Sequence, residues 1–366
     1  MSEPLKLEER AVLELRRLYR AYGYGPFKMS KFEPFALYLN HKEFLVSEGA
    51  ITFTDTDGTL MALKPDVTLS IVKNYRPEQT PLQKVYYNEN VYRMAGAGHS
   101  YREIMQTGVE CLGQVDFAQL AEVILLAAWS LAAISPAFVL DLSHLGIIAD
   151  VLASLGLSEE EKTNALTCLR QKNRDAMAQL LEAYAPQEAA PLLTLTTLTG
   201  PVAAVLPQLA PLLSTETGKA ACQELQALSA LLEAAGLSER VQLDFSVVND
   251  MNYYNGIVFR GYVEGIPTGI LSGGQYDQLM SRMGKEARGV GFAVYLDQLE
   301  RLDQTPADLD ADTVLLYEPG QDLGPLFAAA QALRDQGERV LLRTRAEQVS
   351  CRRVVRLVNG EVTEVG

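Results

Sequence analysis

The sequence predicts an α+β protein in which helices flank an antiparallel sheet. Short runs rich in β-branched and aromatic residues alternate with glycines and polar clusters, a pattern typical of antiparallel strands. A helical pattern precedes these runs, and a long Ala- and Leu-rich stretch divides them into two groups. The predicted strands are residues 51–55, 60–63, 83–87, 91–93, 107–112, 138–142, 241–248, 257–263, 269–271 and 289–295.

Helical patterns occur before, between and after these strands. The first helix is predicted over residues 5–22, where apolar side chains recur at helical spacing. A second helix is predicted over residues 117–133, with Asp116 in position to cap it through its carboxylate. The remaining predictions are a helical insertion at about 146–237, a helix or loop at 279–285 and a closing helix at 296–302.

The chain is predicted to contain a large domain and a small one. Residues 1–302 form the large domain, and the helical insertion lies inside it. Residues 303–312 are acidic and contain a proline, which is typical of a linker. Residues 313–366 predict a β-α-β module that ends in a hairpin, and its roughly 55 residues are few for an independently stable domain.

Composition narrows the possible functions. The net charge is −14, whereas nucleic-acid binding depends on basic side chains, so we expect no nucleic-acid partner. The four cysteines are scattered without a CxxC pair, so neither a zinc site nor a redox motif is expected. We expect no metal and no cofactor. The N-terminus lacks a signal-peptide pattern, and the apolar stretch at 123–134 is too short to cross a bilayer. We therefore expect a cytoplasmic protein without membrane contact.

The first candidate binding segment joins a predicted strand to a short helix. A proline sets the turn, and Asp66 and Thr68 follow it closely. A carboxylate and a hydroxyl so placed can hold an ammonium group by charge-assisted hydrogen bonds. The alternative is structural, with Asp66 or Thr68 capping a helix at residues 69–75. Taken alone, the segment favours the structural alternative.

The second candidate is a polar face on two neighbouring strands. Gln106 and Glu110 lie on the same face as Gly108 because side chains alternate along a strand. Arg93 belongs to the preceding strand, and an arginine suits a substrate carboxylate. Glu110 suits an imidazole N–H or an ammonium group. A solvated face with surface ion pairs explains the pattern equally well.

The third candidate consists of tyrosines near two glycines. Tyr253 and Tyr254 precede a β-branched run, where their hydroxyls can close a polar pocket or where the rings simply pack in the core. Gly273 and Gly274 allow close backbone approach to a ligand, although a glycine pair more often marks a turn. Neither pattern is specific by itself.

The order and spacing of these segments resemble the catalytic core of class II histidyl-tRNA synthetases. The resemblance extends from about residue 5 to residue 302, and the motifs are specific only in combination. It implies the class II synthetase fold, an antiparallel sheet flanked by helices that is usually dimeric and holds a histidine site. The motifs are Lys64-Pro65-Asp66-Val67-Thr68, Tyr92-Arg93, Gln106-Thr107-Gly108-Val109-Glu110, Tyr253-Tyr254-Asn255, Gly273-Gly274-Gln275-Tyr276-Asp277 and Gly289-Val290-Gly291-Phe292-Ala293.

The resemblance also implies which residues would hold histidine. Asp66 stands where the family usually has a glutamate, which shortens the side chain and keeps its charge. Tyr253 is included as the neighbour of a matching tyrosine. The implied histidine-binding residues are Asp66, Thr68, Arg93, Gln106, Glu110, Tyr253, Tyr254 and Tyr276.

Three departures from the family concern the triphosphate. Ala95 stands in place of a glutamate, and Asn249 and Gln298 each stand in place of an arginine. Adenylyl transfer depends on positive charge held around the phosphates, and losing one such group typically costs about two to three orders of magnitude. The sequence therefore predicts no efficient synthetase and no catalytic residues.

A receptor for histidine fits these losses better than an enzyme. The chain resembles the regulatory subunits of ATP phosphoribosyltransferase, which are synthetase-like proteins of histidine biosynthesis. That resemblance implies assembly with a short catalytic subunit, a homodimer within the hetero-oligomer, and a part in histidine feedback. The small C-terminal module resembles a curtailed anticodon-binding domain. The alternatives are a divergent histidine–tRNA ligase or histidine-adenylating enzyme, and a binding protein without an enzyme partner.

Overall fold

The protein consists of two compact units, of which Leu5–Leu302 is the larger. Among the described residues, the larger unit contains a nine-stranded and a three-stranded sheet, and the smaller unit contains a four-stranded sheet. The computed structural model describes residues 5–41, 50–95, 100–248, 253–302, 309–358 and 360–365.

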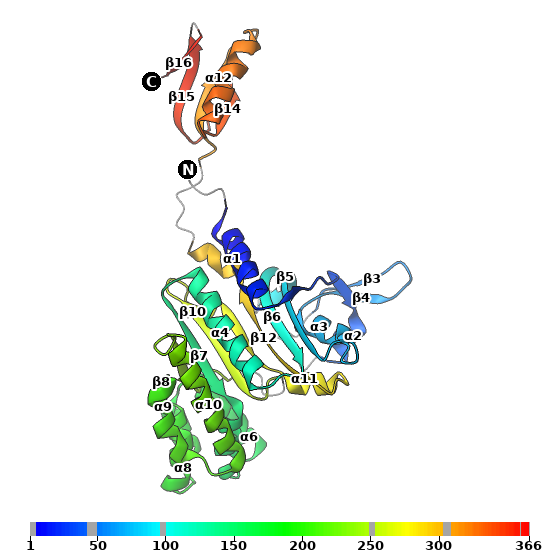
Figure 1. Ribbon diagram of the computed structural model, residues 1–366, viewed down its shortest axis with the longest axis vertical. Coiled ribbons are helices and arrows are strands. Elements are labelled where there is room, and N and C mark those ends of the chain that lie inside the picture. The colour runs from blue at the N-terminus through cyan, green and yellow to red at the C-terminus, as the bar shows by residue number, and fades with distance from the viewer. Residues whose placement is uncertain are drawn as a thin grey trace. The chain divides into compact units, whose positions relative to one another are not determined.

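The nine-stranded sheet is the centre of the larger unit (Figure 1). Neighbouring strands are antiparallel except for β1 with β5 and β7 with β9, which are parallel. The predicted α+β class is confirmed, but a purely antiparallel sheet is wrong at these two pairs. Parallel strands require a long crossover, and the helical insertion supplies it between β7 and β9. In order, the strands are β1 (Gly25–Pro26), β5 (Leu82–Ala95), β6 (Ser100–Gly113), β12 (Arg288–Tyr295), β11 (Leu271–Gln275), β10 (Ile257–Val263), β7 (Phe138–His144), β9 (Val241–Asp244) and β8 (Thr199–Pro201).

Two helices cover one face of this sheet, α1 (Leu7–Ala21) and α4 (Phe117–Ile134) (Figure 1). Asp116 caps α4 as predicted, because its carboxylate accepts a hydrogen bond from the backbone N–H of Ala118 at 2.7 Å. Among the described helices, α4 alone is long and apolar enough to cross a membrane. It packs against β6, β7, β10, β11 and β12, so it serves as the core helix of the larger unit.

The predicted strands lie at or near observed strands, but several of their boundaries were wrong. Residues 83–87 and 91–93 belong to one strand, β5, because its ladder with β6 continues without a break through Asn88 and Asn90. The predicted strand at 269–271 is displaced to β11, which contains Gly273 and Gly274. A long backbone ladder here outweighs the low strand propensity of asparagine and glycine. The closing helix at 296–302 is a 3₁₀ helix, η4 (Leu296–Arg301).

The predicted insertion forms a group of helices at one end of the sheet (Figure 1). It is not purely helical, because Thr199–Pro201 forms β8 and pairs with β9. The helices are α5 (Leu145–Ser154), α6 (Glu159–Arg170), α7 (Arg174–Leu180), α8 (Pro186–Leu195), α9 (Val202–Leu209), η3 (Ala210–Leu212) and α10 (Glu216–Ala234).

A second apolar cluster supports the other face of the sheet near β5 and β6. It includes Val72 and Leu279, together with the buried rings of Tyr38, Tyr253 and Tyr276. The surrounding elements are β2 (Phe32–Pro34), α2 (Phe35–Leu39), β3 (Thr52–Thr54), β4 (Leu60–Leu63), α3 (Thr68–Asn74) and α11 (Asp277–Arg282), with β2, β4 and β3 forming the three-stranded sheet.

The smaller unit has its own core. Leu315, Leu326, Leu333 and Val355 are buried together between a helix and a sheet. The strand order is β14-β13-β15-β16. The elements are β13 (Ala311–Leu316), α12 (Leu323–Asp335), β14 (Val340–Arg343), β15 (Cys351–Val358) and β16 (Glu361–Glu364), which match the predicted β-α-β module and hairpin.

Candidate functional site

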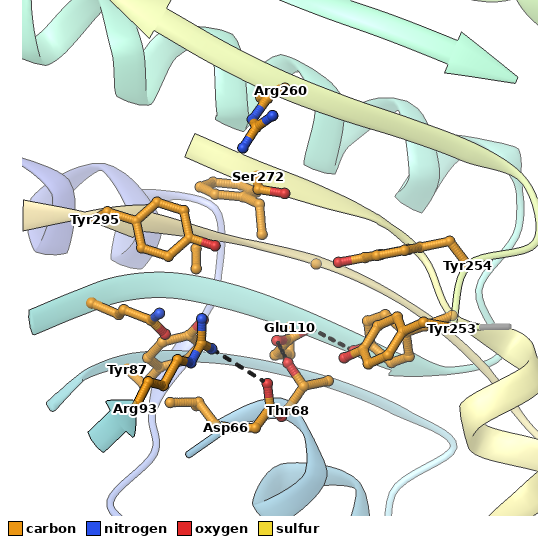
Figure 2. A pocket seen from close by; sticks show the side chains of 16 residues that line it. Asp66, Thr68, Tyr87, Arg93, Glu110, Tyr253, Tyr254, Arg260, Ser272 and Tyr295 are labelled. Carbon is orange, nitrogen blue, oxygen red and sulfur yellow. Dashed lines mark hydrogen bonds and ion pairs between the residues drawn. The ribbon is translucent and has the colours of Figure 1, made fainter. Parts of the chain in front are cut away.

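One cavity of about 370 Å³ opens on the sheet face away from α1 and α4 (Figure 2). This volume lies at the lower end of the range for small-molecule sites. All eight residues implied by the sequence resemblance line it, so five segments of the chain meet there. The lining residues are Asp66, Val67, Thr68, Tyr87, Arg93, Gln106, Glu110, Tyr253, Tyr254, Arg260, Ser272, Tyr276, Gly291, Phe292, Ala293 and Tyr295.

Two small residues of β12, Gly291 and Ala293, line the floor of the cavity. In the register of the sheet, Ala293 pairs with Gly108, and Gly291 pairs with both Glu110 and Gly274. A Cβ atom at Gly291 would lie only 1.8 Å from Oε2 of Glu110. The glycine is therefore required for the Glu110 side chain to occupy its position.

Glu110 is a buried carboxyl that accepts two hydrogen bonds. The hydroxyl of Thr68 donates to Oε1 at 2.7 Å, and the hydroxyl of Tyr276 donates to Oε2 at 2.5 Å. Burial raises the pKa of Glu110 to about 8, although both hydroxyl groups oppose that shift by stabilising the ionised form. The carboxyl is therefore poised to bind a group that donates a hydrogen bond or carries a positive charge.

Asp66 combines the two roles considered for it. Its Oδ1 accepts the backbone N–H of Leu69 at 2.9 Å, so the structural alternative of helix capping is correct for Asp66. Its Oδ2 lies 3.9 Å from the guanidinium of Arg93 and also faces the cavity. Burial raises the pKa of Asp66, and the charge of Arg93 opposes the shift.

The side chain of Arg93 is held in place by the backbone of the turn before α3. Its Nε donates to the backbone carbonyl of Pro65 at 2.8 Å, which fixes the guanidinium beside the turn that precedes α3. Gln106 lies nearby on β6, and its Nε2 is buried without a hydrogen-bond partner among the described residues. Buried donors are normally paired, so this amide suggests that a ligand atom completes the site.

Three tyrosines close one side of the cavity. The rings of Tyr253 and Tyr254 lie 4.5 Å apart between centroids, and Tyr253 meets Tyr276 edge-on at 6.1 Å. Burial raises the pKa of each hydroxyl well above 10, so all three stay protonated and can donate hydrogen bonds. The Tyr253 hydroxyl also makes a hydrogen bond with the side chain of Thr68.

Of the three positions that depart from the synthetase pattern, Gln298 is not among the described residues that line the cavity. Gln298 lies on η4, where it accepts a hydrogen bond from Thr268 at 3.3 Å and donates one to Asp297 at 2.8 Å. Ala95 is the last residue of β5, and Asn249 lies outside the described residues.

Sequence reasoning missed four polar residues of the cavity: Tyr87, Arg260, Ser272 and Tyr295. A usable signal existed for Arg260, because it is the single charged residue in the apolar strand β10. The register places Arg260, Ser272, Ala293, Gly108 and Tyr87 in one row across five strands. Strand order was needed to see this row, and one sequence does not provide it.

The fold and the cavity together define a protein of the class II histidyl-tRNA synthetase type. The family model described as histidyl-tRNA synthetase matches residues 3–299. Among solved structures, the chain is similar to an "ATP phosphoribosyltransferase regulatory subunit/histidyl-tRNA synthetase" from Bacillus halodurans, with a TM-score of 0.74 and 26% identity over 94% of this chain and 91% of that one.

A curated relative from Moorella thermoacetica, named ATP phosphoribosyltransferase regulatory subunit, is 31% identical over 92% of this chain and 87% of its own length. The chain therefore belongs to the histidyl-tRNA synthetase family and, within it, to the ATP phosphoribosyltransferase regulatory subunits. A chain in a solved ATP phosphoribosyl transferase complex from Thermotoga maritima shares the fold, with a TM-score of 0.63 and 18% identity over 79% of this chain and 97% of that one.

Proposed function

We propose that this chain is the non-catalytic regulatory subunit of ATP phosphoribosyltransferase and that its cavity is a histidine receptor. One observation carries the proposal: the seven side chains that match the family's histidine-binding positions converge on a single cavity, together with Tyr253. In this role the chain is required by a short catalytic subunit and takes part in histidine feedback at the first step of histidine biosynthesis.

The cavity offers suitable chemistry to each of the three polar parts of histidine. Glu110 and Tyr276 suit the imidazole, since a carboxylate accepts its N–H and a hydroxyl can serve its other nitrogen. Asp66 suits the ammonium group. Arg93 suits the carboxylate, and the unpaired Nε2 of Gln106 supplies a further donor to it.

We propose that catalysis is lost because positive charges that would stabilise the triphosphate are missing. Gln298 is neutral, and its amide is engaged by Thr268 and Asp297. Asn249 is likewise neutral where the family has an arginine. Two missing cations around a triphosphate would together slow adenylyl transfer by about four to six orders of magnitude if their effects were additive.

We propose that histidine regulates the enzyme because its binding is coupled to the equilibrium between states of the assembly. Histidine can inhibit only if it binds one state of the assembly more tightly than another. The proposed assembly contains this chain as a homodimer together with the catalytic subunit in the cytoplasm, without nucleic acid or membrane. The name of the Moorella thermoacetica relative supports the enzyme partner, and the net charge of −14 supports the absence of nucleic acid.

The direct test mixes this chain with a short-form ATP phosphoribosyltransferase and measures activity with and without histidine. Activity should depend on the chain and fall when histidine is added. Histidine-dependent exchange between ATP and pyrophosphate, measured on the chain alone, would instead support the ligase alternative. If histidine binds but no phosphoribosyltransferase co-purifies from a cell extract and none is activated, the stand-alone binding protein is supported.

A further inference from the structure

The side of the cavity farthest from Arg93 has a different chemistry. Arg93 enters from β5, whereas Arg260 lies on β10, with β6, β12 and β11 between them. Strands are about 4.8 Å apart, so the two backbones are separated by roughly 19 Å. Arg260 therefore reaches the cavity from a strand far from the one that carries Arg93.

Ser272 and Tyr295 lie close to Arg260 on the next two strands. Arg260 pairs with Ser272, and Ser272 pairs with Ala293, which is two residues before Tyr295 on the same face of β12. Directly opposed side chains on neighbouring strands have Cβ atoms about 4.5–5.5 Å apart. Figure 2 shows the guanidinium of Arg260 directed toward Ser272, with the ring of Tyr295 beside them.

The positive charge of Arg260 is not paired with a carboxylate among the described residues. Its side chain makes a hydrogen bond with Tyr262, which is neutral. Asp141 is its register partner on β7, but the charges that shift the pKa of Asp141 are those of Asp244 and Lys172. An exposed arginine that lines a cavity without an anionic partner is available to a ligand.

The two hydroxyl groups beside it are also available. In the described part of the chain, neither Ser272 nor Tyr295 makes a side-chain hydrogen bond. The stem of Arg260 packs against Gly269, where a Cβ atom would lie 2.8 Å from Nε. The backbone of Gly269 thus limits where the guanidinium can go, and this reduces the conformational entropy lost when an anion binds.

We propose that Arg260, Ser272 and Tyr295 form a phosphate-binding subsite, which takes the phosphate group of a small phosphorylated metabolite. The guanidinium offers two parallel N–H groups to two phosphate oxygens, and each hydroxyl can donate one further hydrogen bond. A phosphate monoester has three terminal oxygens to receive them, whereas a carboxylate has two. The subsite goes beyond the proposed function because it shares none of the eight histidine residues.

The test is calorimetric titration of the full chain with inorganic phosphate, ribose 5-phosphate and acetate. Arg260→Gln should weaken binding of both phosphates by about 10- to 100-fold, since a hydrogen bond to a charged group contributes about 1.5–3 kcal/mol. Ser272→Ala and Tyr295→Phe should each weaken it by about three- to tenfold. Arg170→Gln is the matched control, because Arg170 is exposed on α6 and outside the cavity.

The subsite would be overturned if the unmodified chain did not bind phosphate, or if it bound acetate as tightly as phosphate. It would also be overturned if Arg170→Gln weakened phosphate binding as much as Arg260→Gln does. The same holds if phosphate binding were lost in Arg93→Gln and retained in Arg260→Gln. Histidine titrations of the same variants separate this proposal from the receptor proposal. Arg260→Gln should change histidine affinity less than about twofold, and circular dichroism should show that it remains folded. Phosphate binding that depends on Arg260 would stand even if the chain did not bind histidine.

Discussion

Tyr276 donates a hydrogen bond of 2.5 Å to Glu110 across 166 positions of the chain. This contact joins the start of α11 to β6, and the hydroxyl of Thr68 binds the other oxygen of the same carboxyl. Three motifs that are weak separately are therefore joined through one side chain. Glu110 is the residue on which the proposed receptor most depends.

The first prediction concerns Glu110→Ala. The variant should lose measurable histidine binding, a decrease of at least about 100-fold, because the imidazole loses its acceptor and two buried hydroxyls lose theirs. The fold should persist, as shown by an unchanged circular dichroism spectrum. Calorimetry provides the affinity, with Glu286→Ala as the control because Glu286 is exposed outside the cavity. Unchanged affinity in Glu110→Ala would remove Glu110 from the binding site.

The second prediction concerns pH and the stability of the ligand-free chain. Burial raises the pKa of Glu110 from 4.5 to about 8. The folded state then holds more protons than the unfolded state between these values, so the free energy of unfolding should fall as pH rises from about 4.5 to 8. Glu110→Gln should flatten this decline by an amount on the order of a few kcal/mol.

Denaturant unfolding at several pH values measures this decline. The comparison is between the unmodified chain, Glu110→Gln and the exposed control Glu286→Gln. The control should retain the full decline. A Glu110→Gln variant with the same pH dependence as the unmodified chain would show that Glu110 ionises normally in the folded state.

The third prediction separates the two roles of Asp66. Asp66→Asn keeps an oxygen that can accept the N–H of Leu69, so stability should change by less than about 0.5 kcal/mol. Asp66→Ala loses that cap and should be about 1 kcal/mol less stable. Both variants lose the charge that faces the ammonium group, so histidine affinity should fall about tenfold in each. Full affinity in Asp66→Asn would leave Asp66 with the capping role alone.

The fourth prediction concerns the floor of the cavity. Gly291→Ala would place a Cβ atom 1.8 Å from Oε2 of Glu110 and 2.4 Å from the carbonyl oxygen of Val109. Relief requires Glu110 to move, so histidine binding should weaken by at least about tenfold and stability should fall by about 1–3 kcal/mol. Gly25→Ala is the matched control, since the nearest atom to its added Cβ lies 4.0 Å away. Equal effects of the two variants would contradict the assigned role of Gly291.

The sequence alone predicted the cavity residues better than the details of the sheet. Side-chain alternation was enough to place Gln106 and Glu110 on one face, because that rule is local. The row of Arg260, Ser272 and Ala293 depends on strand order, which is a long-range property. The parallel pairing of β7 with β9 was missed for the same reason. Polar residues in β5 were assigned to a break because their propensity was weighed without the partner strand.

The last prediction is that Gln298→Arg will not create an adenylating enzyme. The new guanidinium would restore one of two missing cations, while Asn249 and Ala95 would remain. It would also lose the hydrogen bonds that Gln298 makes with Thr268 and Asp297. Histidine-dependent exchange between ATP and pyrophosphate should stay at background, beside an active histidyl-tRNA synthetase assayed in parallel. Exchange well above background in this variant would show that charge at position 298 alone separates receptor from enzyme, and the absence of catalysis could then not be ascribed to Asn249 and Ala95.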